Sequence, residues 1–179
     1  MKLNFDTINN LSADYGDSFY LLDSVKFANN YDEFLNAFQS IYPKTNIGYS
    51  YKTNYTPKLC KIIDTKGGFA EVVSDMEYSL AINIGVKPAN IIVNGPYKPE
   101  KALKRFLLAG SIVNLDSYKE VSLLEKIAKE NPTVPMLIGL RCNFDINNDN
   151  ISRFGFNVED DDFFAMFDRL GSIPNVVLT

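Results

Sequence analysis

The sequence predicts an α/β protein built on a parallel β-sheet, and more specifically the N-terminal part of a (β/α)₈ TIM-type barrel. Apolar strand-like segments alternate with helical patterns at a period of roughly 20 to 25 residues, which is the signature of repeated βαβ units. These segments are apolar on both faces, as expected for buried parallel strands. About six of the eight strands of a barrel can be counted, and a complete barrel typically needs about 250 residues.

The last strand-like segment, residues 176–178, lies at the end of the 179-residue sequence with no covering helix after it. An uncovered parallel strand would leave apolar surface exposed, so we favour a barrel whose remainder lies beyond residue 179. An open sheet is the alternative.

The chain begins with residues 1–23, which we interpret as a leading segment that ends in a strand over 18–23. Residues 24–179 are assigned to the barrel part, and they open with a helix expected over 24–41. The barrel strands are then expected at residues 47–51, 69–73, 91–93, 112–115, 134–140 and 176–178.

The helices between these strands carry clear end signals. Thr56 can cap a helix that has Pro57 at its first position, and Gly67 ends it. Ser74 and Glu77 have the spacing of a capping box, in which the serine side chain bonds the backbone N–H of the glutamate and the glutamate side chain bonds the backbone N–H of the serine.

The next helices are marked in the same way. One begins at Pro99 and ends at Gly110, and Ser117 with Glu120 forms a second capping box. The acidic residues 159–162 suit the first turn of a last helix, because negative charge is stabilised at a helix N-terminus. An apolar face is expected to follow, formed by Phe163, Phe164 and Phe167.

Composition limits the classes of function. The chain is 46% hydrophobic, with 18 basic and 22 acidic residues and no basic cluster, which makes nucleic acid an unexpected partner. No apolar run approaches the ~20 residues of a membrane span, and the N-terminus lacks a signal-peptide pattern. We therefore expect a cytoplasmic protein, in which Cys60 and Cys142 are reduced core residues rather than a disulfide.

The chain contains no histidine. This excludes Ser-His-Asp and Cys-His mechanisms and removes the commonest ligand of zinc and iron, so no metal site is expected. Any chemistry must use lysine, carboxylates, hydroxyls or a cofactor.

Lys52 is the residue that points most clearly to a reaction. It follows the strand expected over 47–51 and begins a polar turn. Partial desolvation at such a position would lower the pKa of the amine and free it for Schiff-base chemistry. The alternative is an ordinary solvated surface charge.

A series of segments then supports the first interpretation. They are Tyr-Gly-Asp-Ser-Phe-Tyr-Leu-Leu-Asp (15–23), Tyr-Ser-Tyr-Lys-Thr-Asn (49–54), Gly-Phe-Ala-Glu-Val-Val-Ser (68–74), the third strand (91–98), Asn-Leu-Asp-Ser (114–117), and Gly-Leu-Arg-Cys-Asn (139–143) followed by Ser-Arg-Phe-Gly-Phe (152–156). In this order and spacing they resemble the fold-type III pyridoxal-phosphate (PLP) amino-acid decarboxylases. That family includes diaminopimelate, ornithine, arginine and carboxynorspermidine decarboxylases.

The resemblance implies roles for particular residues. Lys52 would hold PLP as a Schiff base and act as the catalytic residue, and Glu71 on the neighbouring strand would lie close to the lysine and the cofactor. Arg141 would lie near the cofactor ring, so Lys52, Glu71 and Arg141 are the expected cofactor-binding residues. A structural ion pair between Glu71 and Arg141 is the alternative. Ser74 is interpreted as a helix cap rather than a ligand.

The chain also departs from the family pattern. The ring-stacking histidine, the Gly-rich phosphate loop, the Glu-Pro-Gly-Arg segment and the C-terminal β domain of the family are absent from residues 1–179. We therefore expect this portion to be inactive by itself. Residues 143–151 are shorter than the histidine-bearing loop of diaminopimelate decarboxylases, which favours a more distant relative, and Arg153 stands where the family has lysine.

The function predicted from the sequence is therefore the N-terminal portion of a PLP-dependent decarboxylase, a carboxy-lyase that acts on a small amino acid and is a homodimer when full length. The alternatives are a PLP-dependent racemase-like barrel and a non-catalytic relative that binds a partner, as antizyme-inhibitor-like proteins do. The motif order favours decarboxylases over racemases, and an intact Lys52 speaks against the non-catalytic relative.

Overall fold

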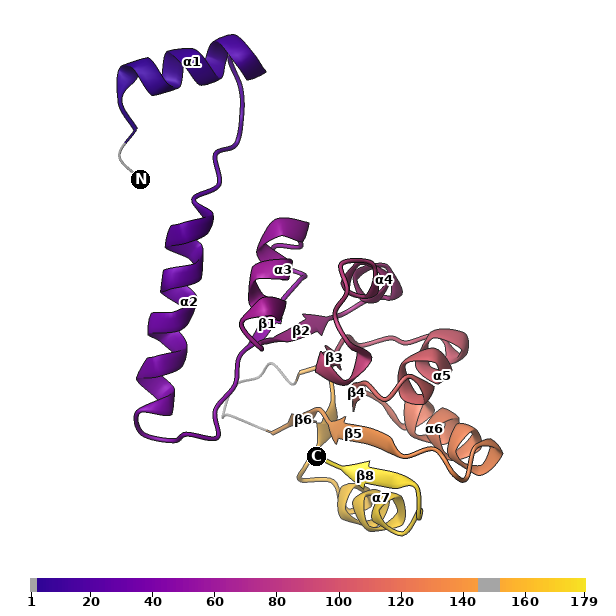
Figure 1. The fold of residues 1–179 in the computed structure, drawn as a ribbon. Helices are drawn as coiled ribbons and strands as arrows, with labels where there is room; N and C mark the ends of the chain where they lie inside the picture. The colour runs from indigo at the N-terminus through magenta and orange to yellow at the C-terminus, as the bar shows by residue number, and fades with distance from the viewer. Residues whose placement is uncertain (1–2, 145–151) are drawn as a thin grey trace. The chain divides into compact units, whose positions relative to one another are not determined.

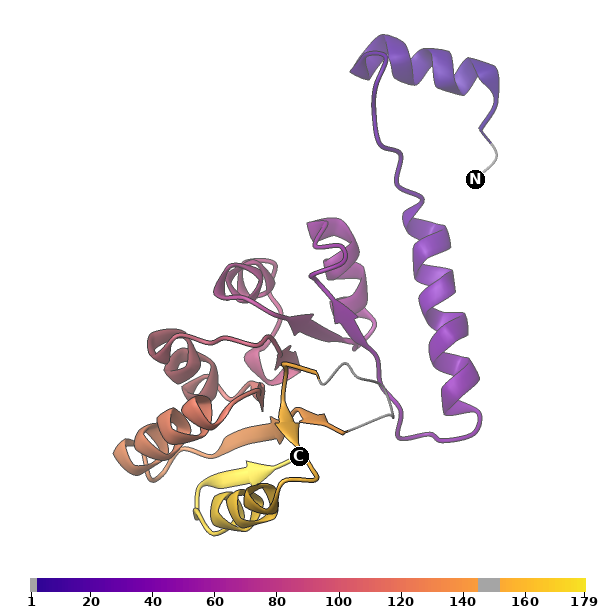
Figure 2. The ribbon, with the colours of Figure 1, turned by 180° about the vertical axis from the view of Figure 1, so that it is seen from behind.

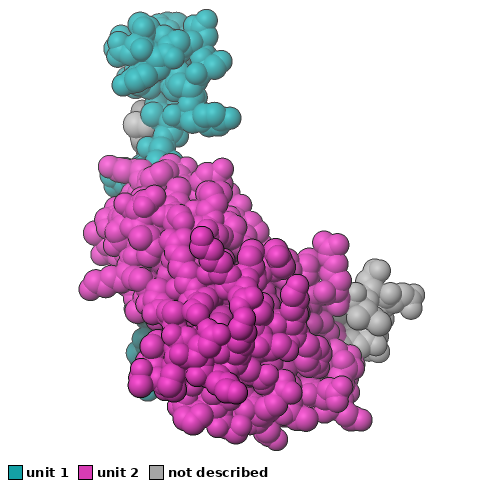
Figure 3. Space-filling model, turned by 90° about the vertical axis from the view of Figure 1, so that its right-hand side faces the viewer, with its two compact units in different colours: residues 1–46 teal, residues 47–179 magenta. Residues whose placement is uncertain are grey.

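The computed structural model describes residues 3–144 and 152–179. The chain forms two compact units, Met1–Asn46 and Ile47–Thr179, which Figure 3 shows in different colours. Most of the short loop noted in the sequence, residues 145–151, lies outside the described residues.

Unit 1 contains two helices within its described residues, α1 (Phe5–Tyr15) and α2 (Ser24–Gln39). Each has a side-chain cap, because Asn4 and Asp23 accept a hydrogen bond from the backbone N–H three residues later. Helix α2 confirms the expected first helix, whereas α1 was not predicted. The strand expected over 18–23 is not formed, because the described residues of unit 1 contain no other strand that could complete its hydrogen bonds.

Unit 2 alternates strands and helices and confirms the predicted parallel α/β architecture. Its main sheet consists of β1 (Gly48–Ser50), β2 (Phe69–Val72), β3 (Ile91–Val93), β4 (Ile112–Leu115), β5 (Met136–Leu140) and β8 (Val176–Leu178). The strands lie in that order and each pairs in parallel with the next.

The helices that connect these strands lie along the outer side of the curved sheet, as Figures 1 and 2 show. They are α3 (Pro57–Thr65), α4 (Asp75–Asn83), α5 (Glu100–Leu108), α6 (Tyr118–Glu130) and α7 (Asp161–Gly171), with a short 3₁₀ turn at η1 (Pro88–Asn90). A small parallel pair, β6 (Cys142–Asn143) and β7 (Phe156–Asn157), follows β5 and was not predicted. Among the helices described, none combines the length and apolar character needed to cross a lipid bilayer.

The two faces of the sheet differ in character. Residues that point toward the helices are fully buried, such as Val72, Val93 and Leu115. The alternate positions on the inner face are only half-buried and include the polar residues Glu71 and Asn114. The prediction of strands that are apolar on both faces holds for the helix side and for inner-face residues such as Phe69, Ile92 and Ile112. It is wrong for Glu71 and Asn114, which lie closer to the carboxyl ends of their strands and line a cavity.

Helix α7 buries a different set of side chains from the one expected. Phe163 is buried, but Phe164 and Phe167 are exposed, and Met166 and Leu170 take their place. The spacing 163, 166, 170 keeps the buried residues on one side of a helix with 3.6 residues per turn.

The prediction for the two cysteines is also corrected in part. Both are free thiols and Cys60 is buried, as expected, but Cys142 is exposed beyond the end of β5.

The starts of α4 and α3 differ in their capping, which allows a direct test of how much a side-chain cap stabilises the protein. Ser74 accepts a hydrogen bond from the Glu77 N–H at 3.2 Å, whereas Thr56, which precedes α3, makes no side-chain capping bond. Replacing Ser74 with alanine should lower the free energy of unfolding by about 1 kcal/mol. Replacing Thr56 with alanine should change it by less than about 0.5 kcal/mol. Urea unfolding followed by circular dichroism measures both, and equal losses would contradict the assignment of the caps.

Candidate functional site

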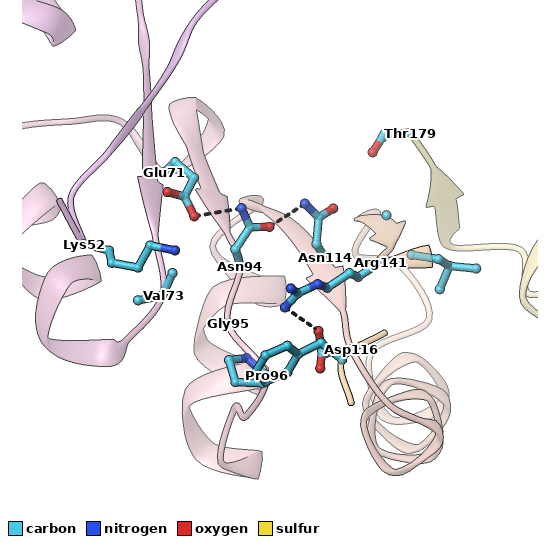
Figure 4. Close-up of a pocket in the computed structure, with 13 residues that line it drawn as sticks. Lys52, Glu71, Val73, Asn94, Gly95, Pro96, Asn114, Asp116, Arg141 and Thr179 are labelled. Atoms are coloured by element: carbon cyan, nitrogen blue, oxygen red, sulfur yellow. Dashed lines mark hydrogen bonds and ion pairs between the residues drawn. The ribbon is translucent and has the colours of Figure 1, made fainter. Parts of the chain in front are cut away.

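A cavity of about 560 Å³ opens at the carboxyl ends of the parallel strands of unit 2. Ligand sites of α/β sheets and barrels form at this edge, because the loops that follow the strands converge there. The polar side chains that line it come from the ends of successive strands (Figure 4), and they are Lys52, Glu71, Asn94, Asn114, Asp116, Arg141 and Thr179.

Lys52 lies in the turn that follows β1. The Thr53 hydroxyl donates to the Ser50 carbonyl at 2.8 Å and closes this turn. The Lys52 side chain points into the cavity (Figure 4), and its amine has no hydrogen bond or ion pair with any residue that the structure describes. The expected partial desolvation is not seen: Lys52 is exposed, because it lies at the open mouth of the cavity.

Tyr51, next to Lys52, points the other way and is fully buried. Burial, with a smaller contribution from the nearby Cys60 thiol, raises the pKa of the Tyr51 hydroxyl far above its usual value. Burial also raises the pKa of the Cys60 thiol. Both groups therefore remain protonated at neutral pH, and neither is a candidate base or nucleophile beside the lysine.

Glu71 is held by a row of amide side chains. The Asn94 amide nitrogen donates to Glu71 Oε1 at 2.8 Å, and the Asn114 amide nitrogen donates to Asn94 Oδ1 at 2.6 Å. The row ends at Gly139, which is paired with Asn114 in the sheet register. A Cβ atom at Gly139 would collide with Asn114 Oδ1, so the absence of a side chain there leaves room for the row.

Arg141 directly follows β5, as predicted, and its orientation is set by two contacts. Its guanidinium donates to Asp116 Oδ1 at 3.1 Å, and its Cζ lies 4.7 Å from the centre of the Phe154 ring. The structural ion pair between Glu71 and Arg141 is therefore not formed, because each binds another partner. Arg141 remains about half exposed on the cavity side, and its side chain is 46% accessible.

The structure brings Lys52, Glu71 and Arg141, the three residues expected to bind the cofactor, together around one cavity. Their roles there stay a prediction. Ser74 caps α4 and does not line the cavity, also as predicted. Arg153, in contrast, is exposed and stacks on the Phe154 ring at 4.7 Å.

Sequence reasoning did not assign Asn94, Asn114, Asp116 or Phe154 to the site. A signal for three of them was present, since Asn94 follows β3, Asn114 lies in β4 and Asp116 follows β4. Polar residues at the carboxyl ends of parallel strands are candidates for a site on that ground alone. Phe154 lies in a loop far along the chain and carries no such signal.

Comparison with known protein families gives a match over residues 29–173 to the pyridoxal-binding domain of pyridoxal-dependent decarboxylases. Among curated proteins, the chain is 28% identical over 137 residues to a diaminopimelate decarboxylase of Methanothermobacter thermautotrophicus, covering 76% of this chain and 30% of the relative. It is 28% identical over 130 residues to a chloroplastic ornithine decarboxylase of Nicotiana glauca, covering 72% of this chain and 28% of the relative.

Among solved structures, the diaminopimelate decarboxylase of M. jannaschii, crystallised with L-lysine, has the same fold. The TM-score is 0.80 at 22% identity, and the match covers 95% of this chain and 42% of that one. The fold is therefore that of the first part of a decarboxylase barrel, and the chain spans less than half the length of these relatives.

Proposed function

Because the chain belongs to the pyridoxal-dependent decarboxylase family, we propose that it is the N-terminal, cofactor-binding part of an enzyme that removes the α-carboxylate of an amino acid. The observation that carries this proposal is the Lys52 amine, which faces the cavity without a partner among the described residues. An amine in that state can bond covalently to an aldehyde, whereas a lysine engaged in an ion pair would first have to break it.

The described residues fit pyridoxal phosphate. The cavity offers an amine for the aldehyde, a carboxylate at Glu71 and a guanidinium at Arg141, so it has both a nucleophile and groups of each charge. Glu71 and Arg141 are each fixed by a hydrogen bond from or to a neighbouring side chain, which holds them at set positions. Pre-arranged groups of this kind need no reorganisation when a ligand binds.

When bound, pyridoxal phosphate would supply an electron-withdrawing ring system able to accept the electron pair of the bond between Cα and the carboxylate carbon, which stays on Cα when CO₂ leaves. The protein's own groups provide attachment and charge. Lys52 would hold the cofactor and, once displaced by the substrate amine, would be free to move a proton near Cα. Arg141 would place a positive charge beside the cofactor ring, and Glu71 would place a negative charge close to the lysine.

We extend the proposal to the whole protein as follows. It acts on a small amino acid as a homodimer in the cytoplasm and does not bind nucleic acid, which agrees with a net charge of −4 and no basic cluster. We retain residues 1–23 as the leading segment and residues 24–179 as the barrel part. The family match over residues 29–173 lies inside the second part, although the two compact units divide later, between Asn46 and Ile47.

Covalent trapping tests the cofactor assignment. We expect the full-length protein, incubated with PLP and reduced with borohydride, to carry the reduced pyridoxyl group on Lys52. Peptide mass mapping locates the label, and Lys58, an exposed lysine on α3, provides an internal comparison. Equal labelling of Lys52 and Lys58 would show that PLP reacts with exposed lysines in general and would contradict the assignment. The same total amount of label in a Lys52→Ala variant, carried by other lysines, would also contradict it.

A further inference from the structure

Lys98 and Glu120 form a buried ion pair beneath the candidate site. Lys98 Nζ lies 2.9 Å from Glu120 Oε2, and each residue is only 3% exposed. Taking two charges out of water is costly, and such a pair often adds no stability compared with apolar residues of similar size. Its presence calls for a role other than stability.

The contacts of the pair show what it holds in place. Glu120 accepts backbone N–H groups from Lys98 at 2.9 Å and from Asp116 at 3.0 Å. Lys98 Nζ also donates to the Gly95 carbonyl at 2.8 Å. The pair therefore fastens the loop after β3 to the end of β4 and to the start of α6.

The segments held by this pair border the cavity. Gly95 and Asp116 both line it, and the Asp116 carboxylate is the partner that orients Arg141. A shift of the Asp116 backbone would carry its carboxylate with it and release the guanidinium. The geometry of Arg141 thus depends on Glu120 through Asp116.

A second capping box in the same chain shows that a buried glutamate can cap a helix start without a lysine partner such as Lys98. Glu77 at the start of α4 accepts the Val73 N–H at 2.7 Å, just as Glu120 accepts the Asp116 N–H. Glu77 is also buried, yet no lysine or arginine among the described residues pairs with it. Capping a helix start in this way does not need a cation, so Lys98 serves the link to the Gly95 loop.

We propose that Lys98 and Glu120 are positioning residues that set the shape of the cofactor pocket by tying the Gly95 loop to the Asp116–Arg141 pair. This inference rests on the proposed function. Neither side chain lines the cavity, so the pair acts through the groups that it holds.

The test removes the charges of the pair and retains similar side-chain sizes. A Lys98→Met/Glu120→Gln double variant of the full-length protein leaves no single buried charge behind and should therefore fold. Its melting temperature should be lower than that of the wild type, because glutamine has one acceptor oxygen for the two backbone N–H groups that Glu120 accepts. Its PLP dissociation constant should rise by about tenfold, the lower end of the effect of losing an outer-shell partner. Absorbance titration with PLP, made well below the melting temperature, measures the affinity of folded protein only.

A matched control uses another lysine–glutamate pair in the same part of the fold, one that joins α5 and α6. Glu100 on α5 and Lys126 on α6 are 2.7 Å apart and exposed, and neither lines the cavity. A Glu100→Gln/Lys126→Met variant should bind PLP like the wild type. Amide hydrogen exchange without PLP gives a second result: residues 95–98 and 116 should exchange faster in the Lys98/Glu120 variant than in the control.

The outcomes distinguish failure of the positioning role of Lys98 and Glu120 from failure of the proposed function. Wild-type affinity and unchanged exchange in the Lys98/Glu120 variant would overturn the positioning role and leave the proposed function intact. Equal loss of affinity in the control variant would also overturn it. Failure of the wild-type protein to bind PLP at all would overturn the proposed function, and this inference with it.

Discussion

Replacing Lys52 with alanine is expected to lower the kcat/KM of the full-length protein for the proposed decarboxylation by at least about a thousandfold, as removal of a covalent catalytic group generally does. Alanine has no amine to bond the cofactor aldehyde or to move a proton near the substrate. The loss should fall mainly on kcat, because Glu71 and Arg141 can still contribute to binding. Steady-state rates of CO₂ release, measured for both proteins at saturating PLP, provide the test.

The control for this experiment is Lys58→Ala, which removes an exposed lysine of α3 that does not line the cavity. Its activity should equal that of the wild type. Full activity in the Lys52→Ala variant would exclude Lys52 as the catalytic lysine. A full biological effect of Lys52→Ala without any decarboxylase activity in the wild type would instead favour the non-catalytic relative.

Replacing Gly95 with alanine is expected to destabilise unit 2 by about 3 kcal/mol, through two separate effects. Gly95 has a φ of +100°, which disfavours any residue with a Cβ atom. The added Cβ would also lie 2.6 Å from the Val73 carbonyl oxygen, so the backbone of one of the two loops must move. Because both residues line the cavity, PLP affinity should fall together with stability.

Gly110 provides the matched comparison. Its φ of +83° is similarly positive, but nothing lies within 4 Å of the position that a Cβ would occupy. Gly110→Ala should therefore cost only the conformational part, about 1 kcal/mol, and leave PLP affinity unchanged. Thermal unfolding of the two variants gives the difference, and equal losses would show that the contact with Val73 has no energetic effect.

Much of the fold could be predicted because its signals are local. The strand positions follow from short apolar runs, and the helix starts follow from pairs such as Ser74–Glu77 and Ser117–Glu120, whose spacing matches one helical turn. Even here the partner differed from the expectation. Glu77 bonds the Val73 N–H rather than the Ser74 N–H, because the strand end lies within reach of its side chain.

Features that depend on distant neighbours could not be predicted. The segment 18–23 has the composition of a strand, but the described residues of its own compact unit contain no second strand with which it could pair. Cys142 lies in an apolar sequence but is exposed, because it extends past the sheet. In each case burial or pairing is decided by residues far away in the sequence.

For the candidate site, too, the local features could be predicted from the sequence and the contacts between distant residues could not. The sequence alone determined that the chain is a parallel α/β protein with Lys52 and Arg141 after strand ends and Glu71 within a strand, because strand positions and residue types are local properties. Only the tertiary structure decided that Glu71 is held by Asn94 and that Arg141 is held by Asp116. These partners come from neighbouring strands, and the register of the sheet, which no local pattern encodes, brings their side chains within hydrogen-bonding distance.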